Sequence, residues 1–486
     1  MGLIFVPVYI KYLGIESYGL IGFFASMQAW FALLDMGMTP TLGREIARFT
    51  GGSRSVESIR DLLRSIEIIT LVIVSILALI IYLSADWLSS SWLTSTKASS
   101  KTISESIKII SVVIGLRFFE GIYRSAILGL QKHVLFNIVN SILATIRSVG
   151  AICILAFVSA TIQSFFIWQG VFSLITVLTL FSLTYTSIPE STRAAKFSLN
   201  ELLLIRKFAG GMSLNVFLAI ALMNIDKTLL SKFLTLTDFG YYTLSSTVAA
   251  GLYMIVMPTE QAFYPKFCEL HAKGDLDELK VTFHKAAQTI SVLVGSAGFL
   301  LIFFGESIVH LWTQNVELAK QTSYIISVLA MANIISGTLL MVHILQLTYG
   351  WTMISVYVNI VNLILVIPAM FWIVPKYGAL GAAYIWLALN LGGIIVSVHF
   401  TFRKIISSEK WKWYWQDVFL PLFIAGLVIG IFKFLFPEPH TNLARILVIS
   451  FALIFALFFS SLVASQVRLF LKLNIRKYLL ARKGLA

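Results

Sequence analysis

The stretch IEIITLVIVSILALIIY, residues 66–82, decides the class of fold. It contains one charged residue, Glu67, and as a helix with modest extension it is long enough to cross a hydrocarbon layer of about 30 Å. Comparable apolar runs recur at residues 141–158, 290–304 and 450–464. A membrane-spanning strand would instead alternate apolar and polar residues over about ten positions. The sequence therefore predicts an all-α integral membrane protein.

The composition of the whole chain agrees with this prediction. Of 486 residues, 58% are hydrophobic and 12% are charged, and the mean hydropathy is +0.88, which is too apolar for a soluble core. Marking the apolar runs gives about 14 transmembrane helices. The net charge of +14 does not indicate a nucleic-acid partner, because the basic residues lie between the apolar runs rather than on one soluble domain.

The basic residues are distributed unequally between the two sets of loops. One set, which includes the C-terminal tail, has a roughly threefold excess of Lys and Arg, and such loops stay in the cytoplasm. The cysteines, Cys153 in an apolar run and Cys268 in a basic loop, predict neither a disulfide nor a metal site. No Gly-rich phosphate loop with a Lys-Ser or Lys-Thr ending occurs, which argues against a built-in ATPase.

Four short echoes indicate an internal duplication. Three of them share an offset near 220 residues and the fourth needs only a longer loop in the second copy. The pairs are Lys11-Tyr12-Leu13 with Tyr18-Gly19 against Lys232-Phe233-Leu234 with Phe239-Gly240, Leu130-Gln131 against Leu345-Gln346, Asn137-Ile138-Val139-Asn140 against Asn359-Ile360-Val361-Asn362, and Phe166-Ile167-Trp168 against Tyr384-Ile385-Trp386.

The offset covers six predicted helices, so both copies have the same orientation and are expected to relate about a pseudo-two-fold axis along the membrane normal. We expect an N-terminal six-helix lobe at 1–190 and a second six-helix lobe at 206–402. Two extra helices and a basic cytoplasmic tail would occupy 403–486. The first predicted helix is short, and we expect its natural beginning to lie upstream.

Charged side chains within the predicted helices of the first half suggest a site. Placing a charged side chain at the centre of a bilayer costs roughly 2.5–3.5 kcal/mol of free energy unless the charge is paired or hydrated. At 100° per residue, Arg117, Glu120, Arg124 and Gln131 fall on one stripe of a helix. The next helix adds Asn137, Asn140 and Arg147. The second predicted helix ends in Asp35, and Arg44 lies just beyond it.

Two interpretations of this basic stripe remain open. Arg117, Glu120 and Arg124 can pair among themselves, since neighbours three and four residues apart meet on a helix. The alternative is a site for an anionic substrate group, because two arginines face one carboxylate and Arg147 has no obvious partner. Arginine suits phosphate through its bidentate fork.

The second half carries fewer charges. Asp226 and Lys227 are adjacent, and Glu260 ends a predicted helix. They are either a simple ion pair and a solvated helix end, or they take part, with Asp35, in gating or in coupling to H+ or Na+. We expect no other cofactor.

The order of several motifs resembles the Wzx-type polysaccharide flippases, the polysaccharide transporter family of the multidrug/oligosaccharidyl-lipid/polysaccharide exporter superfamily. The resemblance spans nearly the whole chain. It rests on Tyr18-Gly19-Leu20, Leu34-Asp35-Met36-Gly37, Arg44-Glu45-Ile46-Ala47-Arg48, Arg117 to Gln131 with Glu120, Tyr123 and Arg124, Asp226-Lys227, Phe239-Gly240-Tyr241-Tyr242, and Gly378 with Gly381-Ala382-Ala383.

The resemblance implies a transporter of the bacterial inner membrane that moves undecaprenyl-pyrophosphate-linked oligosaccharides, such as O-antigen units of lipopolysaccharide, to the periplasmic leaflet by alternating access. Arg117, Arg124 and Arg147, with Arg44 at the mouth, would hold the pyrophosphate or an acidic sugar. Gln131, Asn137 and Asn140 would bond sugar hydroxyls. Membrane lipids and other polysaccharide-assembly proteins would be its partners.

Two other functions are open from the sequence. An ion-coupled multidrug or cation antiporter of the same fold needs carboxylates in its cavity, whereas the first half is net basic. A membrane enzyme of polysaccharide assembly needs acid, base or metal groups in a loop. The longest predicted outer loop, residues 86–104, has no histidine. We therefore expect a transporter and not an enzyme.

Overall fold

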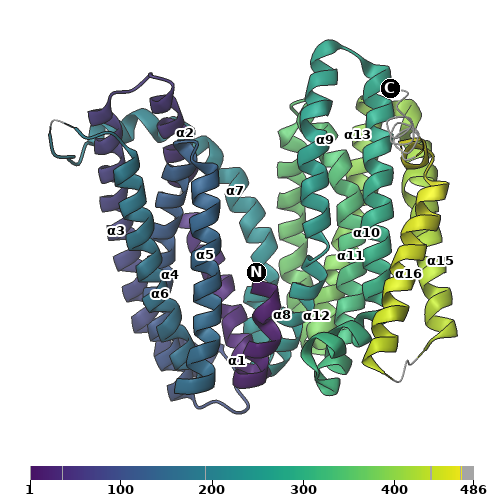
Figure 1. Cartoon of the computed structure of the whole chain (residues 1–486), viewed down its shortest axis with the longest axis horizontal. Helices are drawn as coiled ribbons and strands as arrows, with labels where there is room; N and C mark the ends of the chain where they lie inside the picture. Colours follow the sequence, from purple (N-terminus) through teal and green to yellow (C-terminus); the bar gives the residue numbers. More distant parts are fainter. Residues whose placement is uncertain (1, 36, 192, 438–440, 471, 473–486) are drawn as a thin grey trace, which may run out of the picture. The chain divides into compact units, whose positions relative to one another are not determined.

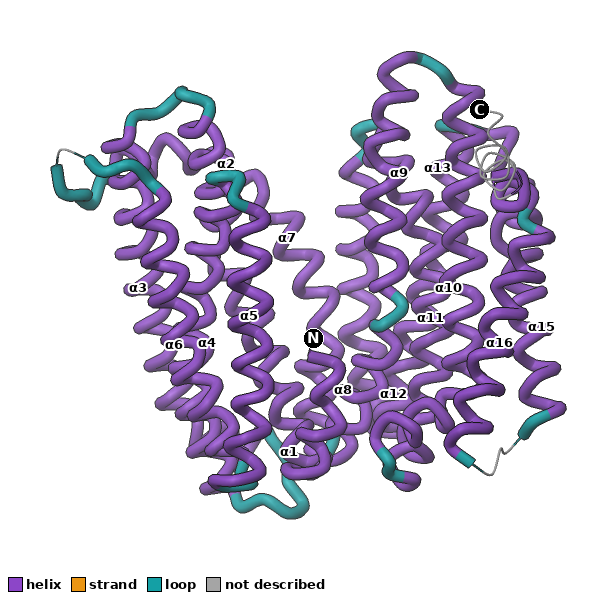
Figure 2. The backbone as a smooth tube through the Cα atoms, in the orientation of Figure 1, coloured by secondary structure: helices purple, strands orange, loops and turns teal. Residues whose placement is uncertain are grey.

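The computed structural model describes residues 2–35, 37–191, 193–437, 441–470 and 472, with side chains omitted at 2–3, 205–216, 219, 352 and 355. Throughout the described part the chain forms helices joined by loops and no strand (Figure 2). Helices satisfy their own backbone N–H and C=O groups, which a membrane-spanning segment must do. The predicted all-α class is therefore confirmed. The basic tail beyond residue 472 lies outside the described residues.

The chain divides into two compact units, Met1–Gly240 and Tyr241–Ala486. Among the described residues, the first unit contains seven α-helices and the start of an eighth, joined mostly by short turns (Figure 1). These are α1 (Gly2–Ala32), α2 (Met38–Thr50), α3 (Val56–Trp87), α4 (Ser100–Gly129), α5 (His133–Cys153), α6 (Ile162–Ser187), α7 (Leu199–Phe233) and α8 (Leu236–Ala250).

The second unit continues from α8. Its remaining elements are α9 (Tyr253–Lys273), α10 (Leu276–Thr313), α11 (Val316–Thr348), α12 (Thr352–Gly393), α13 (His399–Lys404), α14 (Lys410–Lys412), α15 (Leu420–Leu435) and α16 (Asn442–Val463). The last two long helices, α15 and α16, pack on each other and on α10. They are the extra C-terminal pair that the sequence predicts.

Nine stretches of the described chain are long and apolar enough to cross a membrane. Two of them, Ile4–Asp35 and Val356–Lys404, contain a break, at Gly14 with φ 81° and at Gly378 with φ 57°. Glycine tolerates such positive φ values, which allows one continuous stretch to form two helices. The helices α4 and α7 are long enough to span but carry charged residues within their apolar sequence.

The unit boundary lies later than the boundary near residue 206 that the repeat suggests. Helix α7 packs against α1, α3 and α2 of the first unit. One of these contacts is a hydrogen bond of 2.6 Å that the indole of Trp30 donates to Thr228. In terms of packing, α7 therefore belongs with the helices that precede it, although the sequence repeat groups it with those that follow.

Helix α2 packs closely on α4 at the end of the first unit that the basic loops predict to be cytoplasmic. Buried Leu42 and Ile46 of α2 contact the core of α3 and α4. Gly129 lies against α2 so tightly that an added Cβ would be 2.5 Å from the carbonyl oxygen of Gly43. The glycine thus allows two backbones to approach, as small residues do between membrane helices.

This packing can be tested with two glycines of α4. Gly129→Ala should lower the free energy of unfolding by about 1–3 kcal/mol, because the methyl group meets backbone that has no room to move. Gly121→Ala is the matched control, since an added Cβ there has nothing within 4 Å, and it should be neutral or stabilising by up to about 1 kcal/mol. Thermal unfolding of the purified protein in detergent measures both, and equal melting temperatures would contradict the packing argument.

Candidate functional site

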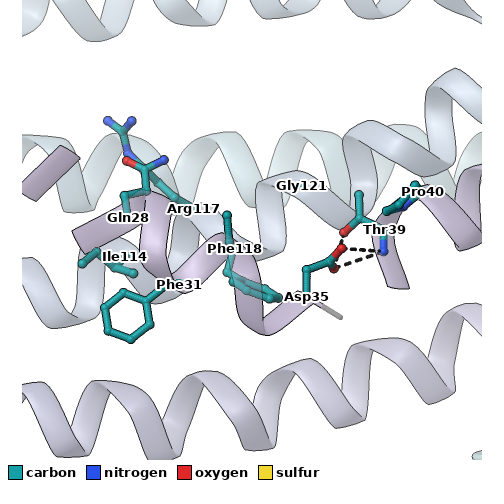
Figure 3. Close-up of a pocket in the computed structure, with 10 residues that line it drawn as sticks. Gln28, Phe31, Asp35, Thr39, Pro40, Ile114, Arg117, Phe118 and Gly121 are labelled. Carbon is teal, nitrogen blue, oxygen red and sulfur yellow. Dashed lines mark hydrogen bonds between the residues drawn. The ribbon is translucent and has the colours of Figure 1, made fainter. Parts of the chain in front are cut away.

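A cavity of about 270 Å³ lies within the first unit, between α1, α4 and the beginning of α2. Figure 3 shows Arg117 and Gln28 at one end of it and Asp35 at the other. Its described lining is Gln28, Phe31, Ala32, Asp35, Thr39, Pro40, Ile114, Arg117, Phe118 and Gly121. Two of the predicted site residues, Arg117 and Asp35, are thereby brought to one cavity.

Arg117 occupies its place through two neighbours. Its Nη2 donates a hydrogen bond of 2.8 Å to Oε1 of Gln169 on α6, and its guanidinium carbon lies 5.4 Å from the ring centre of Phe24 on α1. The Nε–H is buried and has no hydrogen-bond partner among the described residues. A guanidinium has five N–H donors, so this one is oriented by the protein while part of its donor capacity is unused.

Asp35 has a structural role at the other end of the cavity. Both carboxylate oxygens accept from the backbone N–H of Thr39 at 3.0 Å, and one accepts from its hydroxyl at 2.6 Å. The carboxylate therefore satisfies the exposed N-terminus of α2, where negative charge is stabilised by the helix dipole. Gly37, with φ 74°, provides the turn that this arrangement requires.

Glu120 pairs with an arginine from another helix rather than within the stripe. Its Oε1 lies 2.8 Å from Nη2 of Arg147 on α5, which also donates to Thr176 at 3.0 Å. The expectation that Arg147 lacks an obvious partner is therefore wrong. Helical periodicity within α4 could not reveal a contact between residues 27 positions apart on two helices. Glu120 also attracts Arg117 electrostatically, while Arg147 repels it, so two arginines from two helices share one carboxylate.

The other predicted residues of the first half are more exposed. Arg124 contacts the ring of Phe136 at 5.7 Å, and Gln131, with φ 59°, forms the turn after α4. Asn137 and Asn140 are exposed on α5. Arg44 on α2 is 44% exposed and lies 3.5 Å from Glu45. None of these five lines the cavity that holds Arg117.

The predicted coupling residues are spread over the two units. Asp226 on α7 is 6% exposed and its Oδ1 lies 3.5 Å from Nζ of Lys227, which also donates to the carbonyl oxygen of Met223 at 3.1 Å. Glu260 is half-buried on α9 of the second unit. Their roles in coupling or gating stay predictions.

Sequence reasoning did not assign a role to Glu67 of α3, whose carboxylate is buried. It accepts hydrogen bonds from the hydroxyls of Tyr123 at 3.0 Å and Tyr185 at 3.1 Å, and from Arg64 at 3.1 Å. An ionisable residue inside an apolar run is a signal that marks such positions. Gln169, the partner of Arg117, was not singled out, because an uncharged side chain in an apolar run stands out less than a charged one.

The Glu120–Arg147 pair predicts a measurable coupling. Glu120→Gln, Arg147→Met and the double variant form a cycle in which we expect a coupling of about 1–3 kcal/mol in the free energy of unfolding, because both side chains are at most 20% exposed. The control cycle at Asp86 and Lys108, where Asp86 is 75% exposed, should give at most about 1 kcal/mol. Equal couplings would contradict a structural role for the pair.

The fold matches that of known membrane transporters. The chain is similar to the lipid II flippase MurJ in an inward closed conformation, with a TM-score of 0.71 and 14% identity over 93% of this chain and 95% of that one. It is also similar to a multidrug resistance MATE family transporter of the MOP superfamily in an inward-facing conformation, with a TM-score of 0.70 and 12% identity over 84% and 96%. These likenesses show that the chain shares the fold of these transporters.

A third solved structure is a MOP-superfamily transporter from Pyrococcus furiosus, whose title describes a binding pocket of reverse polarity, with a TM-score of 0.51 and 13% identity over 84% of this chain and 94% of that one. No curated protein sequence matches this chain. The sequence profile described as "Polysaccharide biosynthesis protein" matches residues 13–317. The chain belongs to that family, as the sequence resemblance implies.

Proposed function

We propose that the protein is a flippase that moves undecaprenyl-pyrophosphate-linked oligosaccharides, O-antigen or related repeat units, from the cytoplasmic to the periplasmic leaflet of the bacterial inner membrane by alternating access. The observation that carries the proposal is the Arg117 guanidinium in the wall of a cavity within the first unit. The family assignment and the transporter fold support it. The predicted cytoplasmic location of the basic loops and the C-terminus gives the direction.

The charge distribution favours an anionic cargo. Glu120 pairs with Arg147 and also attracts Arg117, so these two arginines share one carboxylate and leave an excess positive charge. An unneutralised arginine in a membrane helix is costly unless it meets water or an anion. A pyrophosphate supplies oxygens that suit the guanidinium fork. The exposed amides of Gln131, Asn137 and Asn140 would then bond the sugar hydroxyls that follow the phosphates.

An ion-coupled cation antiporter is the second candidate, because the Asp35 carboxylate lines the same cavity as Arg117. Asp35 is already bonded to Thr39 through both oxygens, which makes it less available to a cation than an unbonded carboxylate. A membrane enzyme of polysaccharide assembly is the weaker alternative. It would change the covalent structure of the saccharide, whereas a flippase moves it unaltered.

The test is transport of the lipid-linked saccharide in cells that lack the chromosomal gene. Arg117→Ala should reduce export by about tenfold or more, since the loss of a charged phosphate contact exceeds about 1.4 kcal/mol. Arg117→Lys keeps the positive charge and should retain part of the export activity. Lys101→Ala is the matched control, because Lys101 is an exposed cation at the far end of the same helix. Membrane insertion is verified for each variant.

Three results would overturn the proposal. Normal surface polysaccharide with Arg117→Ala would remove Arg117 from substrate binding. Export of cationic dyes that persists in Arg117→Ala and is lost in Asp35→Asn would favour the antiporter. A lipid-linked saccharide whose mass changes when the purified protein is added would indicate an enzyme.

A further inference from the structure

The duplicated Tyr18-Gly19 and Phe239-Gly240 motifs lie against each other within the first unit. An added Cβ at Gly19 would be 2.2 Å from the carbonyl oxygen of Leu236, and one at Gly240 would be 2.4 Å from the carbonyl oxygen of Ile15. The partners Ile15 and Leu236 are related by the same offset of 221 residues as the two glycines. The contact is therefore unchanged when the two copies of the repeat are exchanged, which places it at the pseudo-two-fold axis of the duplication.

The loop between α3 and α4 is bonded to α1 beside this glycine crossing. The carboxylate of Glu16 accepts from the hydroxyl of Ser95, from the hydroxyl of Thr96 at 3.1 Å, and from the backbone N–H groups of Thr96, Lys97 and Ala98 at 3.2–3.3 Å. Glu16 is 7% exposed, and none of the donors to it within the described chain is a cation. Several neutral donors thus hold one buried charge.

The same loop is bonded on its other side to the junction of α7 and α8. The backbone N–H of Leu236 donates to the carbonyl oxygen of Thr94 at 2.8 Å, and the indole of Trp92 donates to Ser231 at 3.1 Å. The hydroxyl of Thr96, which bonds Glu16, also lies 3.3 Å from that of Thr237. Glu16 and Thr237 are equivalent positions of the repeat, so Thr96 joins the two copies next to the crossing.

We infer that residues 91–98 fasten α1 to the α7–α8 junction as an outer seal, and that Glu16 is the positioning residue that keeps this seal closed. The inference rests on the proposed function, which places this loop on the periplasmic side. The bonds to Glu16 are strong while water is excluded and are replaced by water once the loop lifts away. A contact of this kind has two stable arrangements, and export requires the open one.

The first experiment measures whether the seal excludes water. Gln28→Cys places a reporter in the lining of the cavity, in a chain whose native thiols are removed by Cys153→Ser and Cys268→Ser. In right-side-out vesicles, adding Glu16→Ala should raise the rate of labelling by a membrane-impermeant maleimide about fivefold or more, because the open state gains population. Glu16→Gln keeps one acceptor oxygen, so its labelling rate should lie between that of the chain with native Glu16 and that of Glu16→Ala.

Glu105→Ala is the matched control for this experiment, because Glu105 is an exposed carboxylate in the second turn of α4, next to the same loop. It should leave the labelling rate unchanged. An unchanged rate with Glu16→Ala, or an equal rise with Glu105→Ala, would overturn the role of Glu16.

The second experiment locks the seal without altering Glu16. Thr96→Cys with Thr237→Cys should form a disulfide on oxidation, stop export of the lipid-linked saccharide, and regain export on reduction. Thr161→Cys with Ser164→Cys is the control pair, whose hydroxyls lie 2.8 Å apart within one helix start, and its disulfide should leave export intact. Full cross-linking of the first pair with normal export would overturn the seal and leave the proposed function standing. Absence of export from the unmodified chain would overturn the proposed function, while the labelling experiment would still decide the seal.

Discussion

The cost of placing charge in a membrane is the constraint on which the arrangement of the first unit depends. Three charged groups in its helices are held by specific neighbours: Glu120 by Arg147, Glu67 by two tyrosines and Arg64, and Arg117 by Gln169 and Phe24. These contacts join α3, α4, α5 and α6, so the polar groups also fix the packing of the helices. Arg117 differs from the others because its described partner is a neutral amide.

This difference connects the packing to the function. A guanidinium oriented by a neutral amide keeps its positive charge in the wall of the cavity between α1 and α4, as the proposed binding of a phosphate requires. The carboxylate in the same cavity, Asp35, instead stabilises the start of α2. Of the two charged groups that line the cavity, Asp35 stabilises a helix end and Arg117 bonds only a neutral amide among the described residues. This arrangement favours an anionic substrate over a cation.

The duplication adds a second constraint. Gly19 and Gly240 allow two helix backbones to approach closely, and Glu16 and Thr237, which differ in charge although they are equivalent in the predicted repeat, bond the same threonine. At this contact the equivalent glycines of the predicted repeat make matching backbone contacts, while the neighbouring side chains differ. The same divergence separates the arginine-rich α4 from its counterpart in the second unit.

The sequence by itself determined the helical class and the extra C-terminal helices, because hydrophobic run length is a property of the chain alone. The internal repeat, inferred from the spacing of motifs, stays a prediction. The sequence also selected Arg117 and Asp35, since charges in apolar segments stand out. Only the tertiary structure decided the pairing of Glu120 with Arg147, the capping role of Asp35 and the grouping of α7 with the first unit. These depend on which faces of separate helices meet, and helical periodicity describes one helix at a time. For the same reason the sequence did not single out Glu16, close to the break in α1. Its carboxylate accepts a hydrogen bond from Thr96, 80 residues away in the chain, and only the tertiary structure shows this contact.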